Sequence, residues 1–353
     1  MSQDFKFPVL IFIVASAIPA CLGQTGIVLA PLRVLDEIPV PSIQIGGMGW
    51  RAVPGNGEFY VQTDRGKYLA VDLRGRTHSA LDVDKVTATT DFDPKDLLVA
   101  DMSPAPRGGA IAPVLWQSKE KILQSAILHF SEDGGYDGLT RQDAQFRPTH
   151  VAEFSSAGDY LVTGYDEHSR VQVSLFDRHG KMLIAHVLPD GKADESPRKT
   201  EPGGHAEMAA AKESGLMQVV SADDDAIYLF DPYKDRKVIR IEPSGKSSEI
   251  ALSKPNLKDG EATMPVALLV THGNLYLYEA VLSKEQTQQE AMELNRFVLS
   301  VYDRYNGTLD ASYTVDDSIG GFPVALAPRE FYFLKEKEAP GGAWSFSLAR
   351  AGW

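Results

Sequence analysis

The sequence has almost no cysteine. Cys21 is the single one in 353 residues, and it lies in an apolar stretch near the N-terminus. No disulfide can therefore form within the folded part of the chain, which must be stabilised by its apolar core. The same count excludes a cysteine nucleophile.

Motifs that mark several common enzyme classes are also missing. The chain has no Gly-x-Ser-x-Gly sequence, the turn that carries the nucleophile of many serine hydrolases. Residues 107–109 are too short for a phosphate-binding glycine loop and follow no βα unit. Residues 223–225 are three aspartates without the glycine and distal glutamate of a calcium loop. They predict a solvated turn.

Basic residues are outnumbered by acidic ones. Lys and Arg total 35, Asp and Glu total 48, and the net charge is -13. A chain of this charge without a basic stripe repels phosphate backbones, so nucleic acid is not an expected partner. Anionic lipid is disfavoured for the same reason. The composition, 43% hydrophobic and 24% charged, is globular and suits one large or two ordinary domains.

No apolar run is long enough to cross a bilayer. The longest candidate, residues 7–20, falls short of the roughly 20 residues that a spanning helix needs. Its length suits the apolar part of a secretory signal, although Asp4 offsets Lys6 in the preceding basic region. We therefore expect residues 1–23 to be a signal peptide and the protein to be exported, to a periplasmic or extracellular location.

Two processing routes are open, besides an uncleaved anchor. Cleavage after Gly23 satisfies the small-residue rule and leaves residues 24–353 as the mature chain. Alternatively, residues 18–21 resemble a bacterial lipobox, which would place a lipid anchor on Cys21. Pro19 departs from that pattern. The first route gives a protein without a membrane span, and the second gives a lipid-anchored one.

Helical patterns are scarce, and strand patterns fill the mature chain. Only residues 283–296 read as a helix, whereas short alternating apolar runs separated by Gly, Asp and Asn turns follow one another from residue 43 onward. One unit recurs: an apolar strand, an acid, a tight turn and a second strand that begins with a polar residue. It is found at residues 71–76, 130–135, 176–181, 230–237 and 302–308.

This repeat predicts an all-β fold. In its spacing and turns it resembles the six-bladed β-propellers of the broad NHL/TolB-like kind, which implies six four-stranded antiparallel blades in a single domain over residues 24–353. The small-residue strands that start the units fit the crowded central axis of such a ring. A seven-bladed ring and a pair of sandwiches are the alternatives. We expect blades to begin near residues 46, 87, 147, 203, 264 and 320.

The last blade has only three strands before the chain ends. A strand within residues 27–38 can supply its fourth strand and close the ring, which would remove a sheet edge. In such a blade the long connections fall on one face, and we assign residues 102–110, 189–204, 253–263 and 283–296 to it. Function in repeat proteins usually lies where insertions gather.

The candidate binding residues open the innermost strands, at the mouth of the channel on that face. They are Trp50, Arg51, Arg147, His150, His205, Glu207, Met264 and Phe322. The alternative interpretation is that the apolar ones fill the core and the histidines make ordinary hydrogen bonds. Two imidazoles and a carboxylate suit zinc, but His150, His205 and Glu207 come from different blades, so we expect no metal and no other cofactor.

Three functions compete. The first is a non-catalytic binding or scaffold module for a protein or another extended ligand, which follows from one-sided loops without catalytic motifs. The second is a hydrolase or lyase at the channel mouth. The third is a sensor that holds a small anion with Arg51 and Arg147. Six-bladed lactonases carry carboxylate and amide ligands at these strand openings. This chain has Gly, Pro, Arg and His there, which argues against lactonase chemistry. The fold alone cannot separate the three functions.

Overall fold

The structure is a computed structural model of the whole chain. It describes residues 30–41, 43, 51–54, 57–64, 66–86, 93, 96–118, 120, 122–143, 146–166, 171–187, 218–221, 225–230, 236–255, 257–258, 260–271, 273–283, 296–315, 319, 321–327, 330–338 and 344–352. The signal peptide predicted at residues 1–23, with Cys21, and the helix predicted beyond Ser283 lie outside these residues. Among the described residues no helix could cross a membrane, being neither long nor apolar enough.

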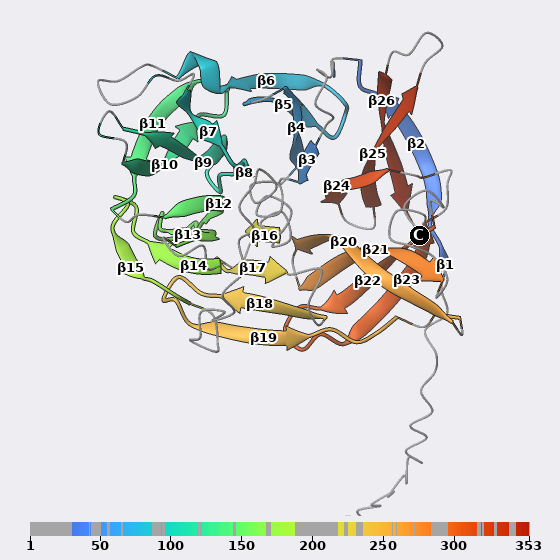
Figure 1. Cartoon of the computed structure of the whole chain (residues 1–353). Coiled ribbons are helices and arrows are strands. Elements are labelled where there is room, and N and C mark those ends of the chain that lie inside the picture. The colour runs from blue at the N-terminus through green and yellow to red at the C-terminus, as the bar shows by residue number, and fades with distance from the viewer. Residues whose placement is uncertain are drawn as a thin grey trace, which may run out of the picture.

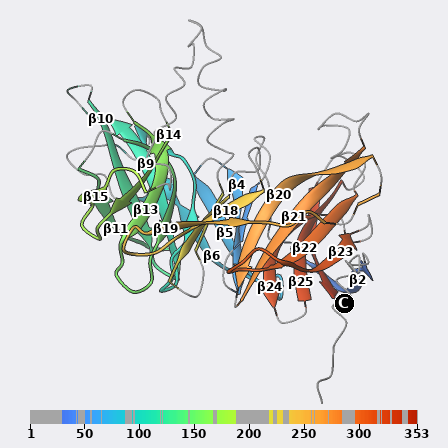
Figure 2. The same cartoon turned by 90° about the horizontal axis from the view of Figure 1, so that it is seen from below.

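Six sheets surround a central axis, as Figure 1 shows face-on. Seen edge-on, the ring is a disc in which the strands within residues 110–184 (green) lie on the opposite side from those within residues 261–352 (orange and red) (Figure 2). Each sheet is antiparallel through four strands, which we letter a to d from the axis outward. The predicted all-β propeller of six four-stranded blades is therefore confirmed.

The first three blades run in chain order. Blade 1 contains β3 (Arg51–Pro54), β4 (Glu58–Asp64), β5 (Lys67–Asp72) and β6 (Thr77–Asp82), and a short 3-10 helix, η1 (Val83–Lys85), follows it. Blade 2 contains β7 (Leu98–Val99), β8 (Ser103–Pro104), β9 (Ala110–Gln117), β10 (Leu123–Phe130) and β11 (Tyr136–Arg141). Blade 3 contains β12 (Arg147–Glu153), β13 (Tyr160–Tyr165), β14 (Val171–Phe176) and β15 (Met182–Ile184).

The other three blades complete the ring. Blade 4 contains β16 (Gln218–Ser221), β17 (Ile227–Phe230), β18 (Lys237–Ile241) and β19 (Ser247–Ala251). Blade 5 contains β20 (Glu261–Thr271), β21 (Asn274–Ser283), β22 (Phe297–Asp303) and β23 (Leu309–Val315). Blade 6 contains β24 (Phe322–Ala327), β25 (Glu330–Glu338), β26 (Trp344–Gly352) and, from the N-terminal side, β2 (Arg33–Pro39).

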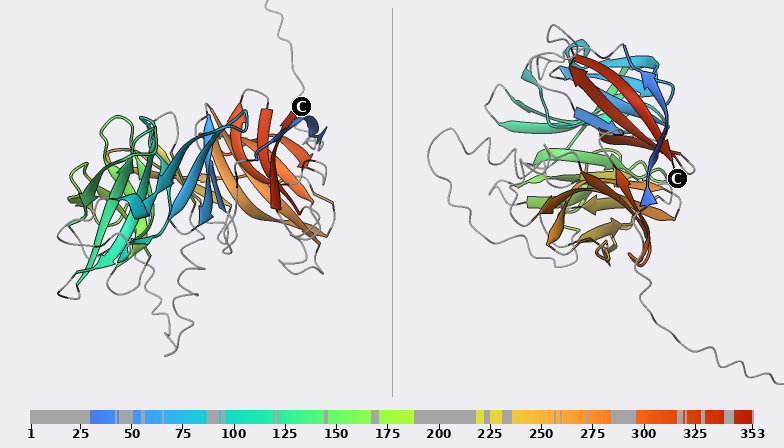
Figure 3. Two further views of the ribbon diagram at one scale, coloured as in Figure 1. Left: turned by 90° about the horizontal axis from the view of Figure 1, so that it is seen from above. Right: turned by 90° about the vertical axis from the view of Figure 1, so that its right-hand side faces the viewer.

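The ring is closed by the N-terminal strand, as predicted. β2 pairs antiparallel with β26, from Arg33 opposite Gly352 to Pro39 opposite Ser347. A second contact was not predicted: β1 (Ala30–Pro31) pairs in parallel with β23, on the outer edge of blade 5. We call residues 30–40 the N-terminal strap, because they join the outer edges of two neighbouring blades (Figure 3).

Six apolar clusters fill the contacts between neighbouring blades, which we call seams. Each cluster consists of side chains from two successive blades. The hydrophobic core is therefore divided into six clusters arranged around the ring. The alternating strands send every second side chain into one seam and the others into the next. Among the described residues the seam between blades 2 and 3 has the smallest cluster, seven buried side chains against fifteen between blades 1 and 2.

The recurring turn joins the c and d strands of a blade. In blade 3 the Asp177 carboxylate accepts the backbone N–H groups of His179 and Lys181, each at 2.9 Å, and the N–H of Gly180 bonds to the Asp177 carbonyl. Because these hydrogen bonds favour the charged carboxylate, the pKa of Asp177 lies below its usual value. Asp72 and Asp303 hold their turns in the same way.

One copy of this turn lies at a different place from the predicted one. The sequence pattern predicts the fourth copy at residues 230–237, but Phe230 ends β17, the second strand of blade 4. The equivalent turn is formed by Glu242 to Lys246, in which Glu242 and Gly245 make the same backbone hydrogen bonds as their counterparts. The acid and a glycine three or four residues later are the local signal, and residues 231–235 lack that glycine.

The glycine of each turn has a positive φ and packs on the outer strand of the preceding blade. Gly180 has a φ of 84°, and a Cβ there would lie 1.7 Å from the carbonyl oxygen of Arg141 in β11. Only glycine adopts this conformation without strain and leaves room for that carbonyl. The turn therefore fixes the spacing between blades 2 and 3.

We expect Gly180→Ala to destabilise the protein more than Gly273→Ala does. Gly273 also has a positive φ, 86°, but nothing lies within 4 Å of its Cβ position. Both variants carry the left-handed strain of about 1–2 kcal/mol, and only the first adds overpacking, worth roughly 1–3 kcal/mol. Urea unfolding of both variants measures the difference. Equal losses would show that the turn does not hold the neighbouring blade.

The two faces of the disc differ in their connections. The a–b and c–d turns lie on one face, and the b–c and blade-to-blade connections lie on the other, which we call the loop-rich face. One predicted excursion belongs elsewhere: within residues 102–110, β8 extends the innermost strand of blade 2 and residues 105–109 form its a–b turn. The strand ends that the other long connections join, those of β15 and β16, of β19 and β20 and of β21 and β22, lie on the loop-rich face.

Candidate functional site

The described candidates lie near the beginnings of innermost strands. Arg51 begins β3, Arg147 begins β12 and Phe322 begins β24, while Met264 is the fourth residue of β20. Arg147 is exposed, and nothing is described of the Arg51 side chain. Trp50, His205 and Glu207 lie outside the described residues. His150 is the fourth residue of β12, so five of the candidates lie on the described parts of innermost strands, toward their loop-rich ends.

Met264 and Phe322 share an apolar environment. Both are half-buried and pack against the cluster of the seam between blades 5 and 6, and Phe322 also contacts the cluster between blades 6 and 1. These contacts indicate that Met264 and Phe322 cover the inner ends of the seams between blades 5 and 6 and between blades 6 and 1.

Three blades share a proline and a β-bulge at this level. Pro148, Pro265 and Pro323 follow the candidate residue in blades 3, 5 and 6, and the strand register shifts by one residue directly after each of them. Proline has no N–H group to donate, so it is tolerated on an edge strand or beside a bulge. The innermost strand of a blade is such an edge.

Blade 3 departs from the other two in the residue pair directly after the bulge. Blades 5 and 6 pair a small residue on the a strand with a tyrosine on the b strand: Ala267 lies opposite Tyr278, and Ala325 opposite Tyr332. Blade 3 has the opposite arrangement, because His150 lies opposite Thr163. The large side chain is thus on the innermost strand, where it reaches the neighbouring blade.

The imidazole of His150 contacts a carboxylate in blade 2. The innermost strand of that blade is interrupted between β7 and β8, and Asp101 lies in the interruption. His150 Nε2 is 3.2 Å from Asp101 Oδ2, and both side chains are buried. Asp101 Oδ1 accepts the backbone N–H of Met102 at 2.8 Å. The pair therefore joins the inner ends of blades 2 and 3.

The second nitrogen of the ring completes a polar chain. His150 Nδ1 lies 3.3 Å from Thr163 Oγ1 and 3.2 Å from Thr149 Oγ1. A hydroxyl, an imidazole and a carboxylate in this order are the groups that activate a nucleophile in hydrolases. Thr163 is buried, however, so its hydroxyl is not open to a substrate in this conformation. The His150–Asp101 contact therefore connects the innermost strands of blades 2 and 3.

A second buried polar network joins blades 4 and 5. The Arg236 guanidinium binds the fully buried carboxylate of Glu279 and donates to the Tyr302 hydroxyl. Burial opposes the charge of Arg236, but its bonds with Glu279 outweigh that effect and raise its pKa. Burial, together with the nearby Glu279 charge, raises the pKa of Tyr302 to about 12. The tyrosine is therefore neutral at physiological pH.

Metal-ligating side chains do not gather within the part of the chain that the structure describes. No group of three or more His, Cys, Asp or Glu side chains there could hold an ion. His150 contacts the carboxylate of Asp101 and the hydroxyls of two threonines. Zinc prefers four ligands of the nitrogen, sulfur or carboxylate type.

Exposed apolar side chains mark the loop-rich end of blade 2. Leu98 begins the innermost strand and is 51% exposed, and Ile122 and Leu123 emerge from the b–c turn. Trp344 occupies the corresponding b–c position in blade 6. Tyr305 is the most exposed of the large apolar residues, at 64%, but lies in the c–d turn of blade 5, on the opposite face.

Sequence reasoning selected His150 but missed Asp101 and the apolar end of blade 2. Asp101 follows the run Leu97 to Ala100 and precedes Met102, so it is a single acid inside an apolar segment. An acid at such a place is the local signal for a buried and paired carboxylate. Its partner, 49 residues later in the sequence, comes from the tertiary structure alone.

Comparisons with known proteins give no family. No protein-family model matches the chain, and no curated protein matches it. Among solved structures it is similar to BamB from Moraxella catarrhalis, with 11% identity, a TM-score of 0.33 and coverage of 90% of this chain and 99% of that one. A glucose dehydrogenase matches at 10% identity and TM-score 0.40, covering 91% and 99%. BBS1N, solved in complex with ARL6DN, matches at 12% identity and TM-score 0.38, covering 92% and 97%. At these values the resemblances carry no information about a ligand or an activity of this chain.

Proposed function

We propose that the chain is a non-catalytic binding module whose loop-rich face docks a protein. The observation that carries this proposal is the exposed apolar group formed by Leu98, Ile122 and Leu123 at the loop-rich end of blade 2. Exposed apolar side chains that cluster on a soluble protein are typical of an interaction site. In its repeat the chain resembles NHL/TolB-like propellers, and we place it beside them on that ground.

The apolar group is built by strand pairing. Leu98 lies opposite Leu115, and Leu123 lies two residue pairs farther along the same sheet, opposite Gln117. Leu98, Leu115 and Leu123 therefore have their side chains on one face of blade 2. The b–c turn beside them is fixed, because Ser118 bonds through its N–H and its hydroxyl to the backbone of Ile122. A rigid apolar surface of this kind loses little conformational entropy when it binds.

A photoreactive residue at position 123 tests the docking face. We expect Leu123 replaced by a photocrosslinking amino acid to give a covalent adduct with a protein in the cell of origin. The same replacement at Tyr305, which is more exposed but lies on the other face, is expected to give none. Adducts at Tyr305 alone, or at neither position, would contradict the proposal.

The mass of the purified protein tests whether the chain is exported. We infer that residues 7–20 direct the chain out of the cytoplasm and that the mature protein is periplasmic or extracellular. Intact-mass analysis of the purified protein is expected to show a chain that begins at Gln24. A lipid on Cys21 would support the anchored alternative instead, and a mass that includes Met1 would contradict both.

The enzymatic alternative has one observation in its favour, the chain of Thr163, His150 and Asp101. A substrate would have to reach the Thr163 hydroxyl, which is buried between blades. The docking surface of the binding module consists of side chains that are already exposed.

A further inference from the structure

One row of side chains crosses all of blade 2 near its loop-rich end. Strand pairing aligns Leu98 with Leu115 and Leu115 with Ser125, and the N–H of Gln142 bonds to the Ser125 carbonyl at 3.1 Å. Residues directly opposite one another in antiparallel strands lie on the same face of a sheet. The row therefore runs from an exposed leucine near the channel to a glutamine at the outer edge.

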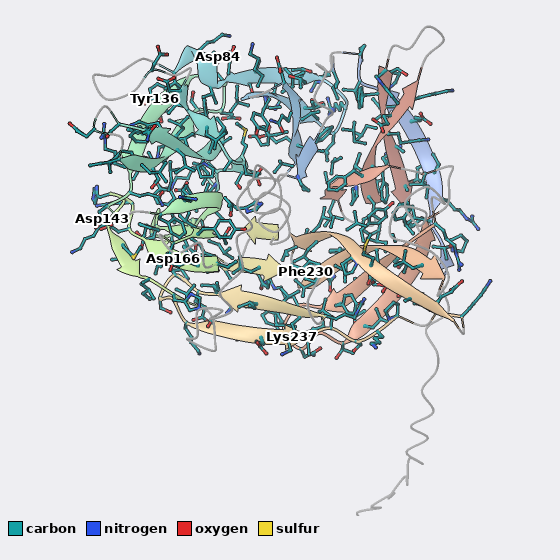
Figure 4. All side chains as sticks on the ribbon, viewed as in Figure 1. Asp84, Tyr136, Asp143, Asp166, Phe230 and Lys237 are labelled. Atoms are coloured by element: carbon teal, nitrogen blue, oxygen red, sulfur yellow. The ribbon has the colours of Figure 1, made fainter. Side chains whose placement is uncertain are left out.

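The row faces blade 3. Ile127, two residues after Ser125 on the same strand, belongs to the apolar cluster of the seam between blades 2 and 3. Side chains two residues apart on a strand share a face, so Ser125 and Gln142 point into the same seam. Figure 4 labels Asp143, the residue after Gln142, at the outer end of this seam. There Asp143 accepts the N–H of Met182 at 2.9 Å and so connects the two blades.

Two residues of this row have buried polar atoms without a hydrogen-bond partner among the described residues. Gln142 is 7% exposed and Ser125 is 4% exposed. Both amide atoms of Gln142, Nε2 and Oε1, and the Ser125 hydroxyl are unpaired there. An unpaired buried polar group costs about 1–3 kcal/mol, and a primary amide with both ends unpaired is a rare arrangement. A ligand that offers one donor and one acceptor side by side would satisfy it.

The opposite wall of the seam has small or polar side chains at this level. Val162 of the apolar cluster lies opposite Ser174, and two residues farther along each strand come Gly164 and Gln172. Ser174 and Gln172 both bond to the carbonyl oxygen of Ala185, at 2.7 and 2.6 Å. Their hydrogen bonds are made within blade 3, so they do not satisfy the Gln142 amide.

We propose that this end of the seam opens to bind an extended polypeptide segment, so that a backbone peptide group pairs with the Gln142 amide, which is buried in the conformation described here. A peptide group has its N–H and C=O in the arrangement that complements a carboxamide, and it can form two hydrogen bonds with it. The exposed Leu98 and Leu123 lie on the face of blade 2 that borders the same seam, and they would cover apolar side chains of the segment. This inference rests on the proposed docking function and assigns it a position and a class of partner.

The variant Gln142→Leu distinguishes an effect on peptide binding from an effect on the stability of the fold. The leucine keeps the size of the side chain and removes the two unpaired polar atoms, so we expect the melting temperature to stay unchanged or rise. The probe is a phage-displayed library of random twelve-residue peptides selected on residues 24–353. Selected peptides are expected to bind Gln142→Leu about tenfold more weakly, which is the loss of two neutral hydrogen bonds. They are expected to bind Leu98→Asp more weakly still.

Gln124→Leu is the matched control. Gln124 lies on the same blade but on the other face of the sheet, opposite Trp116, and its replacement is expected to leave peptide binding unchanged. Equal binding by wild type and Gln142→Leu, or the failure to select any peptide, overturns the inference. So does a clear fall in the melting temperature of Gln142→Leu, which would show that the amide has a structural partner. If the photoreactive residue at position 123 gives no adduct in the otherwise wild-type protein, the docking function itself is contradicted. If the adduct forms equally well in the Gln142→Leu variant, only this inference is contradicted.

Discussion

A chain that begins at Pro41 is expected not to reach the folded state. It lacks the N-terminal strap, so β26 loses the partner that covers its outer edge from Ser347 to Gly352. It also loses Leu32 from the seam between blades 5 and 6 and Val40 from the seam between blades 6 and 1. Two such side chains contribute about 1.5–3 kcal/mol each, and the pairing of β2 adds to this. The sum is comparable with the whole stability of many domains, roughly 5–15 kcal/mol.

Point variants within the strap provide the matched comparison. Leu32 is 4% exposed and donates its N–H to the carbonyl of Thr314, whereas Leu35 is 51% exposed. We expect Leu32→Ala to cost about 2–4 kcal/mol, as for other buried leucines, and Leu35→Ala to cost less than about 0.5 kcal/mol. Circular dichroism and urea unfolding measure both.

Addition in trans tests the mechanism of closure. A synthetic peptide of residues 30–40 is expected to restore folding of the shortened chain, because it can add to the β26 edge as a strand. A shortened chain that folds with wild-type stability by itself would show that the other five seams are sufficient and that the strap is dispensable.

Glu279→Leu is expected to cause a large loss of stability for a single side-chain substitution. Glu279 is fully buried and is the carboxylate partner of Arg236, so its removal leaves a guanidinium in the seam without a counter-charge. Breaking a buried pair in this way costs about 3–5 kcal/mol. The bonds with Glu279 that raise the pKa of Arg236 are lost in this variant, but a guanidinium keeps its proton in proteins and so stays charged in the seam.

The double variant Arg236→Met with Glu279→Leu distinguishes a buried charge from lost packing. It is expected to recover most of the stability, because replacing both partners by apolar groups is often close to neutral. Glu249→Gln breaks the exposed pair with Lys237 and is the surface control, with an expected change within about 1 kcal/mol. A double variant as unstable as the single one would show that the network matters through its shape and not its charge.

The architecture could be predicted from the sequence because its signals are local. An acid, a glycine three or four residues later and the alternation of the flanking strands all act within one turn, as Asp177 and Gly180 show. The one wrongly predicted turn position also has a local cause. Phe230 and Asp231 have the same apolar-acid pattern as the other copies of the turn. The third feature, the glycine, is missing there and is present at Gly245.

The candidate site was predicted only in part, because its partners are distant in sequence. His150 could be selected as an imidazole on an innermost strand, but nothing in the chain indicates that Asp101 of the preceding blade faces it. Gln142 has no distinguishing neighbours in the sequence. Its importance comes from a strand register that places it beside Ser125 and from the lack of a partner for either side chain among the described residues.

The sequence by itself determined the class of fold and the number of blades, because strand periodicity and tight turns depend on hydrogen bonds and side chains a few residues apart. Closure of the ring was predicted by counting strands, because the last blade has only three before the chain ends. The tertiary structure decided which seams are apolar and which are polar, where the N-terminal strap lies, and which buried groups have partners. Those properties depend on contacts between blades, and a side chain enters one seam or the next according to a register that shifts by a single residue at each bulge.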